Sequence, residues 1–137
     1  MQPHRLVALV IALGFAGCGG RPRADQPPRP SDPKQLALAL HLDLERLGEL
    51  AHRLRGRCPE LVAELRPHVA RMRAHAAEVK QAMQDRKLAI ELKSEVLAYD
   101  ERDRGLSDVI GTDLGASYLS CKQATELRAL IDQIPSL

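Results

Sequence analysis

Hydrophobic residues recur every three or four positions along most of the chain after residue 33. Because an α-helix turns once in about 3.6 residues, this spacing puts the apolar side chains on one face of successive amphipathic helices. The first helix is predicted to begin at Pro33, since Asp32 can act as its N-cap residue and Gln35 can complete a capping box. Its apolar face consists of Ala37, Leu40, Leu44, Leu47, Ala51 and Leu54.

A second helix follows after a short turn. Gly56 can end the first helix and Pro59 can start the next one, so the two are expected to form an antiparallel hairpin. The apolar positions of the second helix are Val62, Leu65, Val69, Met72, Ala76, Val79 and Met83. Their register breaks near residues 84–87. The break predicts either a turn or a stutter within one helix of about 45 residues.

The C-terminal third of the chain is less regular. Ala89, Leu92, Val96 and Tyr99 indicate a third helix, which the polar run 100–104 and Gly105 should end. Residues 106–115 contain two more glycines and are predicted to be an irregular connector. Ser117 or Ser120 could then cap a last helix, whose apolar face is Leu127, Leu130, Ile131 and Ile134. Because no segment alternates with the period of a strand, residues 33–137 are predicted to form an all-α, up-down bundle, which we expect to contain four helices.

Composition excludes several functions. Lys and Arg number 20 and Asp and Glu 18, so the chain lacks the basic excess of a nucleic-acid-binding protein. Aromatic residues make up 2% of the chain, so stacking platforms for bases or sugars are not expected. The sequence carries none of the common hydrolase, metalloprotease or phosphate-loop motifs. We therefore expect neither enzymatic activity, nor a cofactor, nor a nucleic-acid partner.

The first 17 residues are predicted to be a cleaved signal peptide. Arg5 precedes an apolar stretch, Leu6 to Ala16, and small residues follow. Eleven helical residues span about 16 Å, which is about half of a ~30 Å hydrocarbon core. A signal for export is therefore favoured over a permanent transmembrane helix.

The end of this signal, Phe15-Ala16-Gly17-Cys18, resembles the lipobox of bacterial lipoproteins. The resemblance implies that residues 1–17 are removed and that Cys18 becomes an N-terminus acylated with chains such as palmitate. It also implies a lipid-anchored protein of the bacterial cell envelope. Phe15 departs from the family, which most often has Leu there. Gly19 in place of the Asp that retains enteric lipoproteins in the inner membrane favours the outer membrane, facing the periplasm.

Residues 18–34 are predicted to be a linker between the acylated cysteine and the bundle. Five prolines lie between Gly19 and Lys34, and no large apolar side chain does. Such a segment favours the extended polyproline conformation, in which each residue adds about 3.1 Å. The linker could therefore hold the bundle up to ~50 Å from the membrane.

Acylation of Cys18 would leave one pair of cysteines, Cys58 and Cys121. Outside the cytoplasm such a pair predicts a disulfide. In a four-helix bundle the second and last helices start at the same end, so the two cysteines can meet. An unbroken helix through residue 85 would separate them by about 60 Å, so the disulfide favours a turn there. Two independent thiols remain the alternative.

The main functional hypothesis is a non-enzymatic interaction or structural module that binds another, unknown envelope protein. The alternative is a periplasmic copper- or haem-binding bundle that uses His68, Met72 and His75, which share a helix face at positions i, i+4 and i+7. The two histidines are about 10.5 Å apart along the axis, so one ion could bind only two of the three side chains. His41 and His52 could add ligands, but packing at the bundle boundary is the simpler expectation. Leu38, Leu42, Leu88 and Leu119 lie off the apolar faces and would mark an interface if exposed together.

Overall fold

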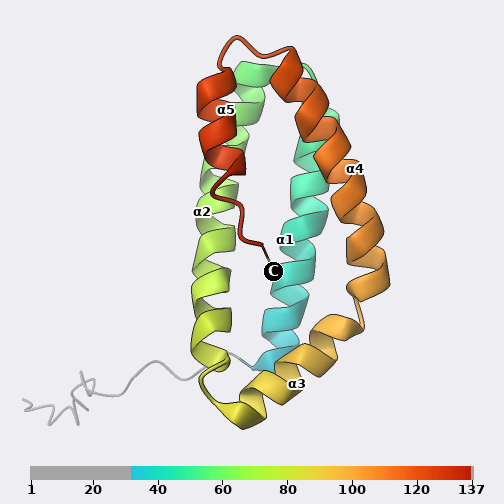
Figure 1. The fold of residues 1–137 in the computed structure, drawn as a ribbon, viewed down its shortest axis with the longest axis vertical. Coiled ribbons are helices and arrows are strands. Elements are labelled where there is room, and N and C mark those ends of the chain that lie inside the picture. The colour runs from blue at the N-terminus through green and yellow to red at the C-terminus, as the bar shows by residue number, and fades with distance from the viewer. Residues whose placement is uncertain (1–31, 137) are drawn as a thin grey trace, which may run out of the picture.

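The protein is an all-α bundle in a computed structural model that describes residues 32–136 (Figure 1). Within that range it contains five helices and no strand. The helices are α1 (Pro33–Arg53), α2 (Cys58–Ala82), α3 (Arg86–Leu97), α4 (Asp100–Leu119) and α5 (Ala124–Ile131). The predicted signal peptide (1–17), Cys18 and the linker up to residue 31 lie outside the described residues. None of the helices in residues 32–136 is long and apolar enough to cross a membrane.

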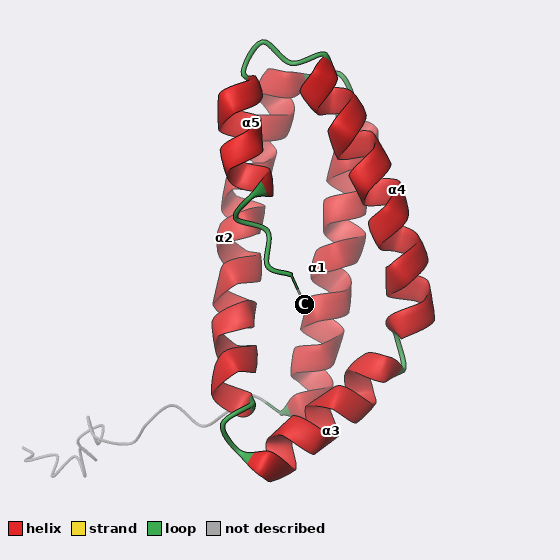
Figure 2. Ribbon diagram, viewed as in Figure 1, coloured by secondary structure: helices red, strands yellow, loops and turns green. Residues whose placement is uncertain are grey.

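The four helices α1, α2, α4 and α5 run alternately up and down the bundle (Figures 1 and 2). α1 and α2 form the predicted antiparallel pair, α3 crosses the bundle obliquely at the end where α1 begins, and α4 returns parallel to α1. α5 runs down beside α2. α1 packs extensively against α2, α3 and α4, so it is the central helix of the bundle. We call the end where α1 begins the tether end, and the end where α2 begins the disulfide end.

The local signals of the first half of the chain are largely confirmed. α1 begins at Pro33, and Gly56 adopts a positive φ of 76° in the turn to α2, a conformation that glycine tolerates. The capping box is wrong in detail, because the Asp32 side chain makes no capping hydrogen bond. The turn near residue 85 is confirmed. Asp85 caps α3 there by accepting hydrogen bonds from the backbone N–H groups of Lys87 (2.8 Å) and Leu88 (3.1 Å).

The predicted connector at 106–115 is wrong, because α4 runs unbroken through it and makes the bundle five-helical in the described range rather than four-helical. Leu106, Ile110 and Leu114 recur every fourth residue and pack into the core against α1. The glycines at 105, 111 and 115 have open space where a side chain would be. Their helix-weakening effect is outweighed by this tertiary packing.

Residues 100–104 and the two serines at positions 117 and 120 have structural roles that differ from those predicted. The run starts α4 rather than ending α3, and Asp100, Glu101 and Asp103 lie in its first turn, where the helix dipole favours negative charge. Neither Ser117 nor Ser120 caps α5, which begins at Ala124 after Gln123. Ser117 is fully buried and its hydroxyl accepts a hydrogen bond from the backbone N–H of Gly56 (3.2 Å).

The core has two parts of unequal size. The main core fills the middle and the disulfide end of the bundle, and includes Leu47, Leu50, Leu61, Leu65, Met72, Ile110, Leu114 and Leu127. The minor core, at the tether end, consists of Leu36, Ala37, Ala82 and Leu92. The apolar burial that stabilises the bundle is therefore concentrated away from the tether end.

Gly48 sets the distance between α1 and α4. A Cβ atom at this position would lie 2.9 Å from Cδ1 of Leu106 and 3.4 Å from Cγ1 of Ile110. The first separation is shorter than an ordinary van der Waals contact, and the second is at the lower limit of one. A larger residue here would have to displace the Leu106 side chain.

Substitution of this glycine tests the close approach. Gly48→Leu should lower the free energy of unfolding by about 1–3 kcal/mol, because the added atoms overpack the α1–α4 contact. Gly115→Ala is the matched control, since its site is open, and it should raise the free energy of unfolding by about 0.5–1 kcal/mol. Urea denaturation of the two variants measures both values. Equal effects at the two sites would contradict the packing described.

Candidate functional site

The predicted disulfide between Cys58 and Cys121 is present. The Cα atoms lie 5.4 Å apart although the residues are 63 positions apart in sequence. Cys58 is the first residue of α2, and Cys121 lies in the turn between α4 and α5. As predicted, two helices that start at the same end of the bundle are joined there. The bond therefore joins the start of α2 covalently to the turn before α5.

The metal-site candidates His68, Met72 and His75 lie on α2 as predicted, but their side chains contact protein groups. Nε2 of His68 donates to the backbone carbonyl of Asp43 (2.9 Å), and Nδ1 accepts from a guanidinium nitrogen of Arg71 (2.7 Å). Nδ1 of His75 donates to a carboxylate oxygen of Asp43 (2.6 Å). Met72 is 2% exposed and belongs to the main core. Both histidines are thus held by Asp43 of α1.

Two further pairs join α1 to α4. Nδ1 of His41 donates to Asp103 (2.5 Å), and Nδ1 of His52 donates to Asp113 (3.1 Å). The His41 ring also stacks on Tyr99, with centroids 4.4 Å apart. These contacts direct His41 and His52 toward α4 rather than toward His68 and His75 on α2. In the described part of the chain, no group of three or more His, Cys, Asp or Glu residues is arranged to hold a metal ion.

Sequence reasoning missed the aspartates of these pairs. Asp43, Asp103 and Asp113 have side chains that are 5%, 19% and 5% exposed. Asp43 lies between Leu42 and Leu44, and Asp113 lies directly before Leu114 on the buried face of α4, whereas Asp103 lies between two arginines. A charged residue at such a position predicts a buried partner, because an unpaired charge in a core is strongly unfavourable. The sequence does not reveal which histidine supplies that partner.

Burial changes the protonation of His68. Loss of solvent lowers the pKa of this imidazole, and the nearby Arg71 guanidinium lowers it further, while the hydrogen bond to the Asp43 carbonyl opposes the shift. The neutral form is therefore favoured. The hydrogen bonds of His68 are consistent with the neutral form, because Nδ1 must be unprotonated to accept a hydrogen bond from Arg71.

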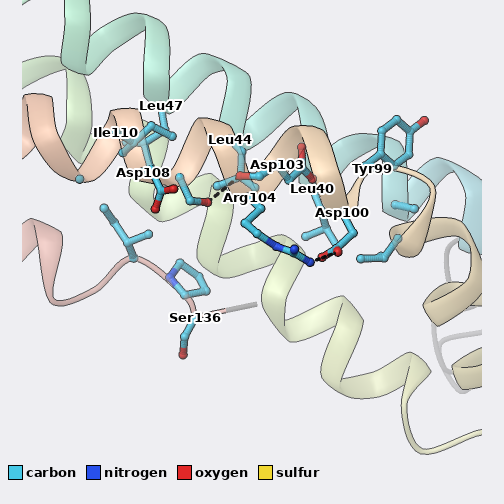
Figure 3. Close-up of a pocket in the computed structure, with 16 residues that line it drawn as sticks. Leu40, Leu44, Leu47, Tyr99, Asp100, Asp103, Arg104, Asp108, Ile110 and Ser136 are labelled. Carbon is cyan, nitrogen blue, oxygen red and sulfur yellow. Dashed lines mark hydrogen bonds and ion pairs between the residues drawn. The ribbon is translucent and has the colours of Figure 1, made fainter.

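A cavity of about 520 Å³ opens between α1, α4 and residues 134–136 (Figure 3). Its walls are mainly apolar and include Leu40, Leu44, Leu47, Ile110 and Ile134. Carboxylates of α4 line its rim, namely Asp100, Asp103 and Asp108. Arg104 pairs with Asp100, and His41 pairs with Asp103. Asp108 is exposed and forms no ion pair with another described residue.

The four leucines predicted to lie off the apolar faces do not form one surface. Leu38 and Leu42 are exposed on α1, and Leu119 is 86% exposed at the opposite end of the bundle. Leu88 packs against the minor core. The condition for an interface of all four residues, that they are exposed together, is therefore not met.

Comparison with known proteins finds no matching family model, no matching curated protein sequence and no matching solved structure. Three features of the described residues are relevant to function. These are the disulfide, the histidine–aspartate pairs of α1, and the cavity with an apolar wall and an acidic rim.

The lowered pKa of His68 predicts how stability depends on pH. The unfolded chain takes up a proton at this imidazole near pH 6.5, whereas the folded chain does so at lower pH. The unfolded state then binds more protons, so the stability due to neutral His68 is fully present above about pH 6.5 and decreases as the pH falls below it.

His68→Gln keeps one donor for the Asp43 carbonyl and one acceptor for Arg71, but it does not titrate. We expect the free energy of unfolding of this variant to fall less than that of the wild type between about pH 7.5 and about pH 5.5. Urea denaturation at the two pH values measures the difference. An equal fall in both proteins would show that His68 is not the group responsible.

Proposed function

We propose that the protein is a lipid-anchored lipoprotein of the bacterial cell envelope that acts as a non-enzymatic interaction module. Its α1–α4 cavity would bind a segment of another envelope protein that carries an apolar and a basic side chain. The observation that carries the binding role is the apolar wall of this cavity beneath the carboxylates of α4. The anchor depends on the lipobox-like residues 15–18.

The disulfide supports the location. Disulfides such as Cys58–Cys121 form and persist in oxidising compartments and are rare in the cytoplasm. Acyl chains on Cys18 would then hold the bundle at the membrane, because each buried CH₂ contributes about 0.8 kcal/mol. Two or more such chains make a lasting anchor. Gly19 favours the outer membrane, with the bundle in the periplasm.

The cavity supports the binding role through its size and charge. Its volume of about 520 Å³ is sufficient for one or two side chains of a bound segment. Apolar groups of the partner would be removed from water against Leu44 and Ile110, which is favourable in proportion to the area buried. Asp108 would pair with a Lys or Arg of the partner. The neighbouring Asp100 and Asp103 are already paired within the bundle.

The copper- or haem-binding alternative has less support. A metal ion on His68 or His75 would have to displace the hydrogen bonds to Asp43, and Met72 would have to leave the main core. Loss of the hydrogen bonds costs free energy because a buried polar group left unsatisfied is unfavourable, and removal of Met72 from the core costs apolar burial. The contacts of these residues account for them as bundle packing.

Photo-crosslinking in the native envelope tests the binding role. A photoreactive residue in place of Ser107, which lines the cavity, should form a discrete adduct with one envelope protein. The same residue in place of Ala70, which is exposed on α2 away from the cavity, should form none. Asp108→Lys should weaken the Ser107 adduct about fivefold, which corresponds to about 1 kcal/mol for an exposed ion pair.

Glu101→Lys is the matched control for that charge reversal. Glu101 is exposed on the same helix but does not line the cavity, so its reversal should leave the adduct unchanged. Equal adducts from positions 107 and 70, or equal loss with both charge reversals, would contradict binding in the cavity.

A further inference from the structure

Large apolar side chains remain exposed at the tether end. Met83 follows α2 and is 41% exposed, while Ile90 and Leu97 of α3 are 61% and 70% exposed. A groove of about 320 Å³ opens beside them. It is lined by Leu40, Val79, Met83, Leu92, Lys93, Val96 and Leu97, of which only Lys93 is charged. The bundle thus leaves an apolar face uncovered where its own core is smallest.

The exposed residues of α3 form a stripe. Arg86, Ile90, Lys93 and Leu97 are spaced by four, three and four positions, so they lie on one side of the helix, and all four are exposed. The carboxylates of α3, Glu91 and Glu95, lie on a different side. The stripe therefore alternates cations with large apolar groups. Such a surface offers apolar groups to the lipid and cations to the lipid phosphates.

Lysines are concentrated at the same end. The chain has five, and Lys34, Lys80, Lys87 and Lys93 all lie on the parts of α1, α2 and α3 that meet there, all exposed. Lys122 lies at the disulfide end. Of the four, Lys87 approaches a carboxylate, that of Glu91, at 3.9 Å. Long cationic side chains can keep their charge at phosphate groups while their stems cover apolar surface.

The preceding chain joins the bundle at this face. Asp32, Pro33 and Lys34 line one small pocket together with Ile90, Glu91 and Ser94 of α3, so the linker meets the bundle beside the stripe. Fourteen positions separate Cys18 from Asp32. At about 3.1 Å per residue they span at most ~43 Å. An acyl anchor on Cys18 would therefore allow α3, which lies at the attachment point of the linker, to reach the lipid surface.

We propose that the tether end docks on the anionic lipid surface of the membrane that holds the anchor, with the stripe of α3 facing the lipid. This inference rests on the proposed lipid anchor. Ile90, Leu97 and Met83 would enter the headgroup region, and Arg86 and Lys93 would pair with lipid phosphates. The bundle would then lie with its α1–α4 cavity to the side and its disulfide end away from the membrane.

Depth-dependent fluorescence quenching tests this orientation. The acylated full chain, purified from its native membrane, is placed in vesicles of phosphatidylethanolamine and phosphatidylglycerol that contain brominated lipid. A small fluorescent residue replaces Leu97 in one variant and Leu119, exposed at the disulfide end, in the other. We expect the probe at 97 to be quenched and the probe at 119 to be unaffected.

Charge reversal separates lipid contact from chance proximity. Arg86→Glu with Lys93→Glu should reduce quenching at position 97 to the level seen at 119, and Lys122→Glu should not. Vesicles of phosphatidylcholine alone should also give weaker quenching than the anionic vesicles. Equal quenching in all these cases would overturn the assignment of an anionic lipid surface. A blue-shifted probe at 97 in the absence of vesicles would overturn it in favour of a second copy of the chain.

Flotation distinguishes this inference from the proposed anchor. Chains that do not float with the vesicles lack a functional anchor, which would overturn the proposed function. Chains that float while the probe at 97 stays unquenched would overturn the docking and leave the anchor standing. Chains that float with the probe at 97 quenched support both.

Discussion

The bond between Cys58 and Cys121 is the constraint that makes one end of this bundle different from the other. It ties the first residue of α2 to the turn before α5, beside the main core. On the chain-entropy model, closing a loop of 63 residues stabilises the fold by about 4 kcal/mol. That is a large share of the net stability of a small domain. Near the tether end, by contrast, the minor core has four buried members and α3 keeps apolar groups exposed.

Between these ends, α1 fixes how the helices lie against one another. Asp43 contacts His68, Arg71 and His75 of α2, while His41 and His52 contact Asp103 and Asp113 of α4. Apolar packing alone tolerates small shifts of one helix along another. A buried carboxylate does not, because a shift would leave it unpaired. The pairs therefore specify the position of α1 between α2 and α4, and α4 packs closely against α1 at Gly48.

Local signals predicted the α1–α2 hairpin and a break in register near residue 85, and the expected pairing of Cys58 with Cys121 favoured a turn at that break. Pro33, Gly56 and the spacing of leucines act within a few residues, so they can be interpreted without knowledge of the rest of the fold. α4 was missed because its glycines suggest a loop, and only the burial of Leu106, Ile110 and Leu114 against α1 outweighs them. The cavity and the aspartate partners were missed for a related reason. The cavity and the aspartate partners depend on which helices pack against each other, and the hydrophobic periodicity of a single helix does not reveal this.

We propose above all that the bundle, closed by the Cys58–Cys121 disulfide, is anchored to the membrane through an acylated Cys18. Intact mass of the protein taken from its native membrane, with thiol labelling before and after reduction, tests it most directly. We expect the mass of the chain from Cys18 onward plus acyl groups, no thiol label before reduction, and two labels after it. A mass without acyl groups would contradict the anchor, and two labels before reduction would contradict the closed bundle.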